Sequence, residues 1–136
     1  MKNNLYYTGR GYVYNLQYHI IWCVKYRHKI INENISKQLK DIITTISEKY
    51  DFKIISMETD KDHIHLLLDC SPQLSIPKLI KILKGTTGRK ILYNNPDIKE
   101  KLYGGHLWSP SYFITTSSDN TNEQIKHYIE SQGKKK

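Results

Sequence analysis

Two histidines separated by one residue could bind a metal ion. His63 and His65 lie in the run Asp60-Lys61-Asp62-His63-Ile64-His65-Leu66-Leu67-Leu68. If residues 63–68 form a buried strand, both imidazoles project from one face, about 7 Å apart at a rise of ~3.3 Å per residue. Imidazole is a common ligand of divalent metals. Paired histidines on strands also occur as hydrogen-bonded structural residues, so the pattern alone leaves two interpretations open.

A second group of candidate residues lies near the end of the chain. Tyr128 and Gln132 are four residues apart, so on a helix they share one face. If that helix crosses the open face of the sheet, both can reach the His pair, and the Gln132 amide oxygen can join two imidazoles around one cation. Positions then remain for water and a phosphate oxygen, as in an open catalytic site. Imidazole suits Mn²⁺ better than Mg²⁺, but phosphate oxygens favour either ion, so the predicted cofactor is Mg²⁺ or Mn²⁺.

Tyr128 then has a chemical role available to it. A phenol with a pKa of ~10 is a poor nucleophile at neutral pH. Beside a metal that polarises a phosphodiester, it needs to attack only once, in line, to form a covalent phosphotyrosine. The protein–DNA bond would conserve the energy needed to rejoin strands without ATP. The alternative for Tyr128 is packing beside Ile125 and Ile129 on an amphipathic helix.

The elements that would position these residues follow from hydrophobic periodicity. Strands are predicted at 13–24, 52–58, 63–68 and 107–116, and Pro110 indicates an irregular or edge position for the last. Helices are predicted at 34–50, after Ser75 as N-cap, and at 121–132, where Asn120 and Glu123 resemble a capping box and Gly133 ends the helix. This order is an α+β, ferredoxin-like or RRM-like βαββαβ antiparallel sheet with helices on one face, plus a C-terminal helix that carries the tyrosine. The His pair is expected on the open face.

Length and composition predict one domain over residues 1–136, with a core at about 12–118 and a polar hinge at 117–120. No segment approaches the ~20 apolar residues of a membrane span, and the N-terminus lacks the apolar core of a signal peptide. Cys23 and Cys70 are interpreted as reduced core thiols. We therefore expect a cytoplasmic protein, nucleoid-associated when it acts on DNA.

The net charge of +8 and the 11 tyrosines favour a nucleic-acid partner, because basic side chains neutralise phosphates and aromatic rings stack on bases. A basic surface that serves only solubility is the alternative. In the basic loop after the first predicted strand, the candidates for contacts with DNA phosphates are Lys25, Arg27, His28 and Lys29. A solvated basic turn is the alternative for this loop.

Taken together, four motifs resemble the single-tyrosine transposases of the insertion-sequence 200/605 family, the IS200-like transposases. They are Trp22-Cys23-x-Lys25-Tyr26-Arg27, Thr59-Asp60-Lys61-Asp62-His63-Ile64-His65, Leu107-Trp108-Ser109 and Ile125-x-x-Tyr128-Ile129-Glu130-x-Gln132. The resemblance runs from about residue 14 to 132. It places the chain in the wider class of His-hydrophobe-His (HUH) endonucleases.

The resemblance implies a DNA transposase. Such enzymes bind imperfect hairpins in single-stranded DNA at the ends of a mobile element, cleave one strand, keep the 5′-phosphate on tyrosine and release a 3′-hydroxyl. His63, His65 and Gln132 correspond to the family's metal ligands, and Tyr128 to its nucleophile. Residues 84–89 occupy the position of a family stretch of Lys, Gly, small hydroxyl residues and Arg, which implies DNA contacts at Lys84 and Arg89. The two glycines of this stretch cost helix stability, ~1 kcal/mol each relative to Ala, which suggests close backbone approach to DNA. The family acts as a homodimer in which the tyrosine helix can sit beside the partner's His pair.

Two other functions are compatible with the sequence. One is a non-catalytic nucleic-acid-binding module of similar topology, although the third strand offers His and Leu where an RNA-recognition sheet carries stacking aromatics. The other is a domesticated relative that processes chromosomal palindromes with the same chemistry. A phosphoesterase with two His-x-Ser/Thr motifs is excluded, because neither His19 nor His106 is followed by such a residue at the required position.

Overall fold

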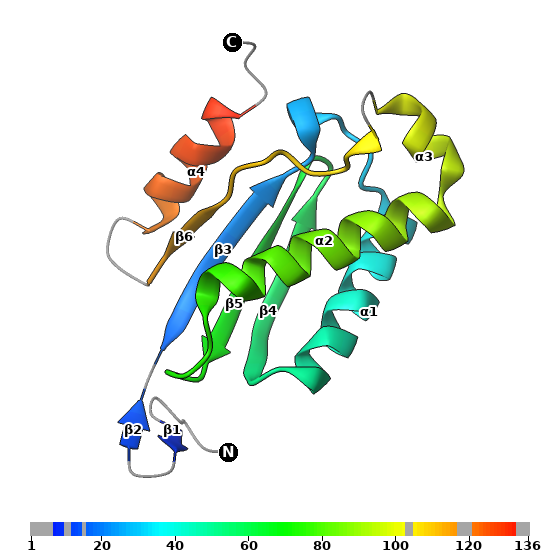
Figure 1. Cartoon of the computed structure of the whole chain (residues 1–136). Helices are drawn as coiled ribbons and strands as arrows, with labels where there is room; N and C mark the ends of the chain where they lie inside the picture. The colour runs from blue at the N-terminus through cyan, green and yellow to red at the C-terminus, as the bar shows by residue number, and fades with distance from the viewer. Residues whose placement is uncertain (1–6, 10–11, 15, 103–104, 117–120, 133–136) are drawn as a thin grey trace.

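A four-stranded antiparallel sheet in the order β4-β5-β3-β6 is the centre of the fold (Figure 1). The computed structural model describes residues 7–9, 12–14, 16–102, 105–116 and 121–132. The strands are β3 (Gln17–Cys23), β4 (Phe52–Asp60), β5 (His63–Cys70) and β6 (Phe113–Thr115). With the helices between them, they form the βαββαβ arrangement, so the predicted α+β, ferredoxin-like fold class is confirmed.

Two helices cover one face of this sheet, as Figure 1 shows. Helix α1 (Glu33–Lys49) begins after Asn32, whose side chain accepts a hydrogen bond of 2.8 Å from the Ile35 N–H. Helix α2 (Ile76–Asn94) begins after Ser75, the predicted N-cap, with proline in its first turn. Both caps satisfy N–H groups that have no partner within the helix. The predicted starts of both helices are therefore correct to within one residue.

The alternation of side chains along β5 decides which face carries the histidines. Ile64, Leu66 and Leu68 are completely buried in the core that α1 and α2 form with the sheet. Successive side chains point to opposite faces of a strand, so His63 and His65 project from the other face. The predicted placement of the His pair opposite the two helices is confirmed.

Three elements differ from the prediction. The strand expected over 13–24 is two strands, because β3 can pair with β5 only as far as Gln17 opposite Asp69. Upstream, β2 (Tyr12–Tyr14) pairs instead with β1 (Tyr7–Gly9) in a separate hairpin. Helix α3 (Pro96–Lys101) was not predicted; proline in its first turn and the buried Ile98 are its sequence signals. The basic segment after β3 includes a 3₁₀ turn, η1 (Lys25–Arg27).

The last strand is shorter than the predicted 107–116. Trp108 forms an isolated bridge with Val24, and regular pairing begins only at β6, on the edge of the sheet. Pro110 lacks an N–H and interrupts the ladder between them, as its position predicted. The final helix, α4 (Thr121–Ser131), matches the predicted 121–132. The predicted hinge at 117–120, the Asn120 cap and Gly133 lie outside the described residues. None of the described helices combines the length and apolar character needed to cross a membrane.

The two faces of β5 can be distinguished by stability. Ile64→Ala should lower the free energy of unfolding by about 2–5 kcal/mol, because it leaves a cavity in the core. Leu67→Ala should cost clearly less, because Leu67 is half-buried on the face of the histidines. Urea unfolding of the two variants measures the difference. Equal losses would contradict the assignment of faces.

Candidate active site

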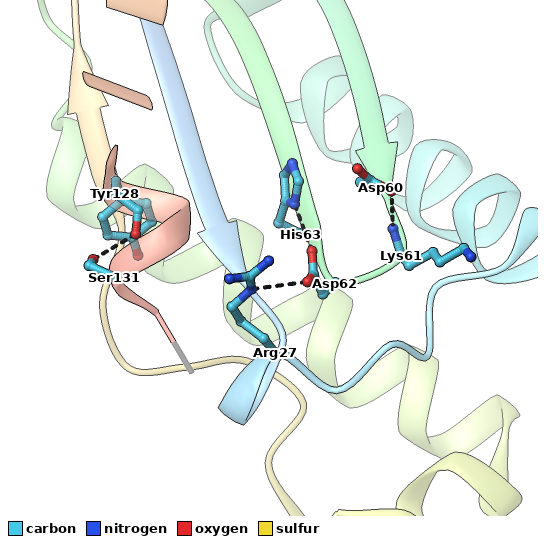
Figure 2. Close-up of polar contacts among 7 residues, drawn as sticks. All are labelled: Arg27, Asp60, Lys61, Asp62, His63, Tyr128 and Ser131. Carbon is cyan, nitrogen blue, oxygen red and sulfur yellow. Dashed lines mark hydrogen bonds and ion pairs between the residues drawn. The ribbon is translucent and has the colours of Figure 1, made fainter. Parts of the chain in front are cut away.

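A buried carboxylate fixes the orientation of His63. Asp62, 5% exposed, accepts a hydrogen bond of 3.0 Å from Arg27 Nε and lies 2.8 Å from His63 Nδ1, as Figure 2 shows. Burial alone would raise the pKa of Asp62, but the hydrogen bonds from His63 and Arg27 hold this pKa below its usual value. With Nδ1 engaged by a carboxylate, the imidazole presents Nε2 to a ligand, a common arrangement around protein-bound metals.

A third histidine touches the predicted pair. His19 Nδ1 lies 2.9 Å from His65 Nε2, and the two rings are 5.1 Å apart. Burial lowers the pKa of both histidines, and each neutral imidazole retains a lone pair. Sequence reasoning assigned no function to His19. The signal that could have found it is strand register, because His65 lies opposite Ile21, two residues from His19 on the same face.

The donor set fits an open metal site better than a closed one. His63 and His65 supply two imidazoles from one strand face, and each has one nitrogen not used by Asp62 or His19. Within the described part of the chain, no three His, Cys, Asp or Glu side chains group as metal ligands. A third protein ligand must therefore be of another type, and the Gln132 amide oxygen has the right chemistry.

Helix α4 lies on the same face of the sheet as the histidines. Ile125 on this helix is buried, and Ile21 and Cys23 of β3 are completely buried although they face away from the main core. A groove of about 460 Å³ lies between α4 and the beginning of β5, with His63 in its lining. The lining carries four cations, Arg27, Lys29, Lys61 and Lys126, and three carboxylates, Asp60, Asp62 and Glu130, and Arg27 is already paired with Asp62. The groove is therefore of mixed charge, with lysines that can contact an anionic strand beside His63.

Tyr128 and Gln132 lie together but not at the His pair of the same chain. The Tyr128 hydroxyl is 2.8 Å from Ser111 Oγ, and its ring packs against Phe113 with centroids 5.6 Å apart. Gln132 Oε1 accepts hydrogen bonds from Ser111 Oγ at 3.2 Å and Ser109 Oγ at 3.4 Å. Figure 2 shows Tyr128 and His63 well apart, with β3 between them in this view. The predicted site residues thus form two separate halves. His63 and His65 are the histidine half, and Tyr128 and Gln132 are the tyrosine half.

The phenol of Tyr128 is protonated in this arrangement. Burial raises its pKa, and the hydrogen bond with Ser111 only partly opposes that effect. When Ser111 donates its single proton to Gln132, Tyr128 must donate to Ser111. Sequence reasoning missed Ser111; its only signal was its place just before the last strand.

The predicted DNA-contacting residues fall into two groups. His28, Lys29 and Arg89 are exposed and Lys25 is half-buried. Arg27 and Lys84, by contrast, are bonded inside the protein, Arg27 to Asp62 and Lys84 to main-chain carbonyls.

The glycines of α2 lie beside other side chains of the protein. A Cβ at Gly88 would lie in ordinary van der Waals contact with the Trp108 ring, at 3.4 Å, and Trp108 Nε1 donates a hydrogen bond of 2.9 Å to the buried Thr87. Gly88 therefore faces the 107–111 segment, and close approach of DNA at this glycine stays a prediction. For Gly85, the nearest atom to an added Cβ is on the Arg89 side chain, at 3.2 Å.

This fold and site define a class of protein. A ferredoxin-like sheet carries a His-hydrophobe-His pair on a central strand, and a tyrosine and a glutamine lie one turn apart at the end of a terminal helix. Residues 12–132 match the family model described as "Transposase IS200 like". The chain belongs to the IS200-like transposase family.

Similar proteins agree with this assignment. The chain is 52% identical over 124 residues to the ISDra2 transposase TnpA of Deinococcus radiodurans, covering 91% of this chain and 89% of that protein. It is 28% identical over 120 residues to the transposase for insertion sequence element IS200 of Salmonella typhimurium, covering 86% of this chain and 79% of that protein.

Solved structures show the same fold. A crystal structure of a transposase from Deinococcus radiodurans R1 superimposes with a TM-score of 0.88 at 42% identity, over 93% of this chain and 97% of that one. The REP-associated tyrosine transposase bound to a REP hairpin has a TM-score of 0.55 at 10% identity, over 84% of this chain and 62% of that one. The second likeness concerns the fold alone.

The buried ammonium of Lys84 generates a pH prediction. Burial lowers the pKa of Lys84 from 10.5 to about 8. Between those two values the unfolded chain binds more protons than the folded one, so stability increases as the pH rises. The free energy of unfolding of the wild type should therefore rise relative to that of Lys84→Met between about pH 8 and 10. Urea titrations across this range measure it, and a constant or falling difference would contradict the lowered pKa.

Proposed function

We propose that this transposase cleaves and rejoins single-stranded DNA through a covalent link between Tyr128 and a 5′-phosphate, with a divalent cation at His63 and His65. The observation that carries the proposal is the pair of imidazoles on one face of β5, with His63 oriented by Asp62 beside a groove whose lining includes three lysines. Family membership supports the same assignment.

The two imidazoles and the Gln132 amide oxygen would hold Mg²⁺ or Mn²⁺, leaving other positions for phosphate oxygen and water. When bound, such an ion stabilises charge on a phosphodiester and on a departing oxygen. The protein's own residues do the remaining work. Asp62 keeps His63 in one tautomer and one orientation, and the cations of the groove hold the strand in line with the nucleophile.

Tyr128 is the proposed nucleophile. Its phenolic oxygen forms a bond to phosphorus while the bond from phosphorus to the 3′-oxygen breaks, so the 5′-phosphate stays on the protein and a 3′-hydroxyl leaves. The phenol must lose its proton in this step, because burial raises its pKa in the observed arrangement. Attack of a 3′-hydroxyl on the phosphotyrosine reverses the reaction and joins the strands.

The separation of the two half-sites supports a homodimer. Tyr128 and Gln132 are bonded to Ser111 rather than placed at the His pair of their own chain. In the proposed dimer, the tyrosine half of one subunit meets the histidine half of its partner. In the alternative arrangement, the two subunits exchange α4, with the hinge predicted at 117–120 as the pivot, and this exchange also brings the halves together.

The proposed substrate is single-stranded DNA that carries a hairpin. A structural neighbour is described as bound to a REP hairpin. In this chain, the lysines of the groove beside His63 and the exposed His28 and Arg89 supply contacts for phosphates. Each neutralised phosphate releases counterions, so binding should weaken steeply with salt.

The nucleophile can be tested directly. Incubation with a single-stranded hairpin and Mn²⁺ or Mg²⁺ should give a covalent protein–DNA adduct visible on a denaturing gel. Tyr128→Phe should abolish the adduct because it removes the attacking oxygen, and a chelator should suppress it. Tyr112→Phe, a change of an exposed tyrosine, is the matched control. An adduct that persists in Tyr128→Phe would assign the nucleophile elsewhere, and binding without any adduct would favour a non-catalytic module.

The arrangement of half-sites can be tested by mixing inactive variants. Tyr128→Phe keeps the histidine half and His63→Ala keeps the tyrosine half. If the site forms between subunits, a mixed dimer contains one complete site of its two. In an equal, randomly exchanged mixture about half of the dimers are mixed, so combining the variants should restore about a quarter of the wild-type adduct formation. Gel analysis after subunit mixing measures the recovery. No recovery in dimers shown to have exchanged subunits would place the complete site within one chain.

A further inference from the structure

We propose that Ser111 and Lys84 are positioning residues that hold Tyr128 and Gln132 together as a preassembled half-site anchored to helix α2. This inference rests on the proposed function of Tyr128 and Gln132, and it assigns a role to residues that touch neither the phosphate nor the cation. Its consequence is that Tyr128 and Gln132 keep a fixed position relative to the body of their own subunit, as is required if the halves meet by association of two subunits rather than by exchange of α4.

The first observation is a hydrogen-bond chain. Ser111 Oγ lies 2.8 Å from the Tyr128 hydroxyl and donates to Gln132 Oε1 at 3.2 Å, so one serine bridges both groups. Ser109 adds a second donor to Gln132 at 3.4 Å. Without these bonds, two side chains one turn apart on α4 would sample several rotamers independently.

The second observation is that the serines themselves are held. The Lys84 ammonium donates hydrogen bonds to the carbonyl oxygens of Ser109, at 2.7 Å, and Ser111, at 2.9 Å. The Ser109 N–H donates to the Cys23 carbonyl of β3, at 2.9 Å. A half-buried ammonium needs such partners, because burial without them is unfavourable. Lys84 therefore connects α2, which packs on the opposite face of the sheet, to the segment whose Ser111 is hydrogen-bonded to Tyr128.

The third observation extends the anchor along α2. Thr87, one turn after Leu83, accepts the hydrogen bond from Trp108. Two side chains three positions apart on one helix, Lys84 and Thr87, thus contact the 107–111 segment. Part of the stretch at 84–89, in which the sequence predicted DNA contacts, therefore holds the segment that is bonded to Tyr128 and Gln132.

Two substitutions test the proposal. Ser111→Ala removes the bridging hydroxyl, and Lys84→Met removes the ammonium while preserving the length of the side chain. Each should lower the single-turnover rate of adduct formation at saturating hairpin DNA by roughly 10- to 100-fold, the effect of small misplacement of a reacting group, with hairpin affinity unchanged. Ser111→Thr, which restores a hydroxyl, should recover most of the rate. Ser47→Ala and Lys90→Met, on α1 and on the exposed face of α2, are the matched controls.

A second measurement is independent of the chemistry. Hydrogen exchange of the amides in α4 should become faster in Ser111→Ala and Lys84→Met, while exchange in α1 stays at the wild-type rate. The effects on rate should also be less than additive in the double variant, because both residues act through one segment. If Lys84→Met accelerates exchange in α1 as well, it has lost global stability, and Lys84→Gln takes its place.

The outcomes separate this proposal from the proposed function. Wild-type rates and wild-type exchange in α4 for both variants would overturn the positioning role. A Ser111→Thr variant as slow as Ser111→Ala would also overturn it, because the hydroxyl would then not be the acting group. An adduct that survives Tyr128→Phe would overturn the proposed nucleophile instead, and faster exchange in α4 would still establish the anchor.

Discussion

The alternation of side chains along β5 is the constraint on which the site depends. Ile64, Leu66 and Leu68 are completely buried beneath α1 and α2, and each contributes about 1.5–3 kcal/mol through burial. A slip of one residue in register would exchange the two faces of the strand. The core therefore fixes the direction of both imidazoles, and the buried Asp62 fixes the rotation of the His63 ring. Stability and site geometry have the same physical origin here.

The tyrosine half of the site, Tyr128 and Gln132, is positioned by hydrogen bonds to an irregular segment and not by a regular strand. The 107–111 segment contains Pro110 and cannot continue the β-ladder, so side chains of α2 hold it in place. This irregular segment in turn presents two serines to Tyr128 and Gln132. Under the proposed mechanism, the phenol is kept protonated and away from the histidines until the halves meet.

Much of the fold could be predicted from the sequence because its signals are local. Helical spacing of apolar residues, the Ser75 cap, the short turn before the His-bearing strand and the effect of Pro110 all appear in the structure where expected. The length of the first strand was wrong, because a strand ends where its partner ends and not where its composition changes. Helix α3 was missed because six residues carry little periodicity.

For the site, the sequence by itself determined which residue types are available and that His63 and His65 share a face, because that follows from the period of a strand. Only the tertiary structure decided that His19 touches His65, that Asp62 orients His63, and that Lys84 points inward. It also decided that Tyr128 lies beside Ser111 and not beside the histidines of its own chain. Contacts between distant segments depend on strand order, register and helix docking, and no local pattern in the chain encodes them.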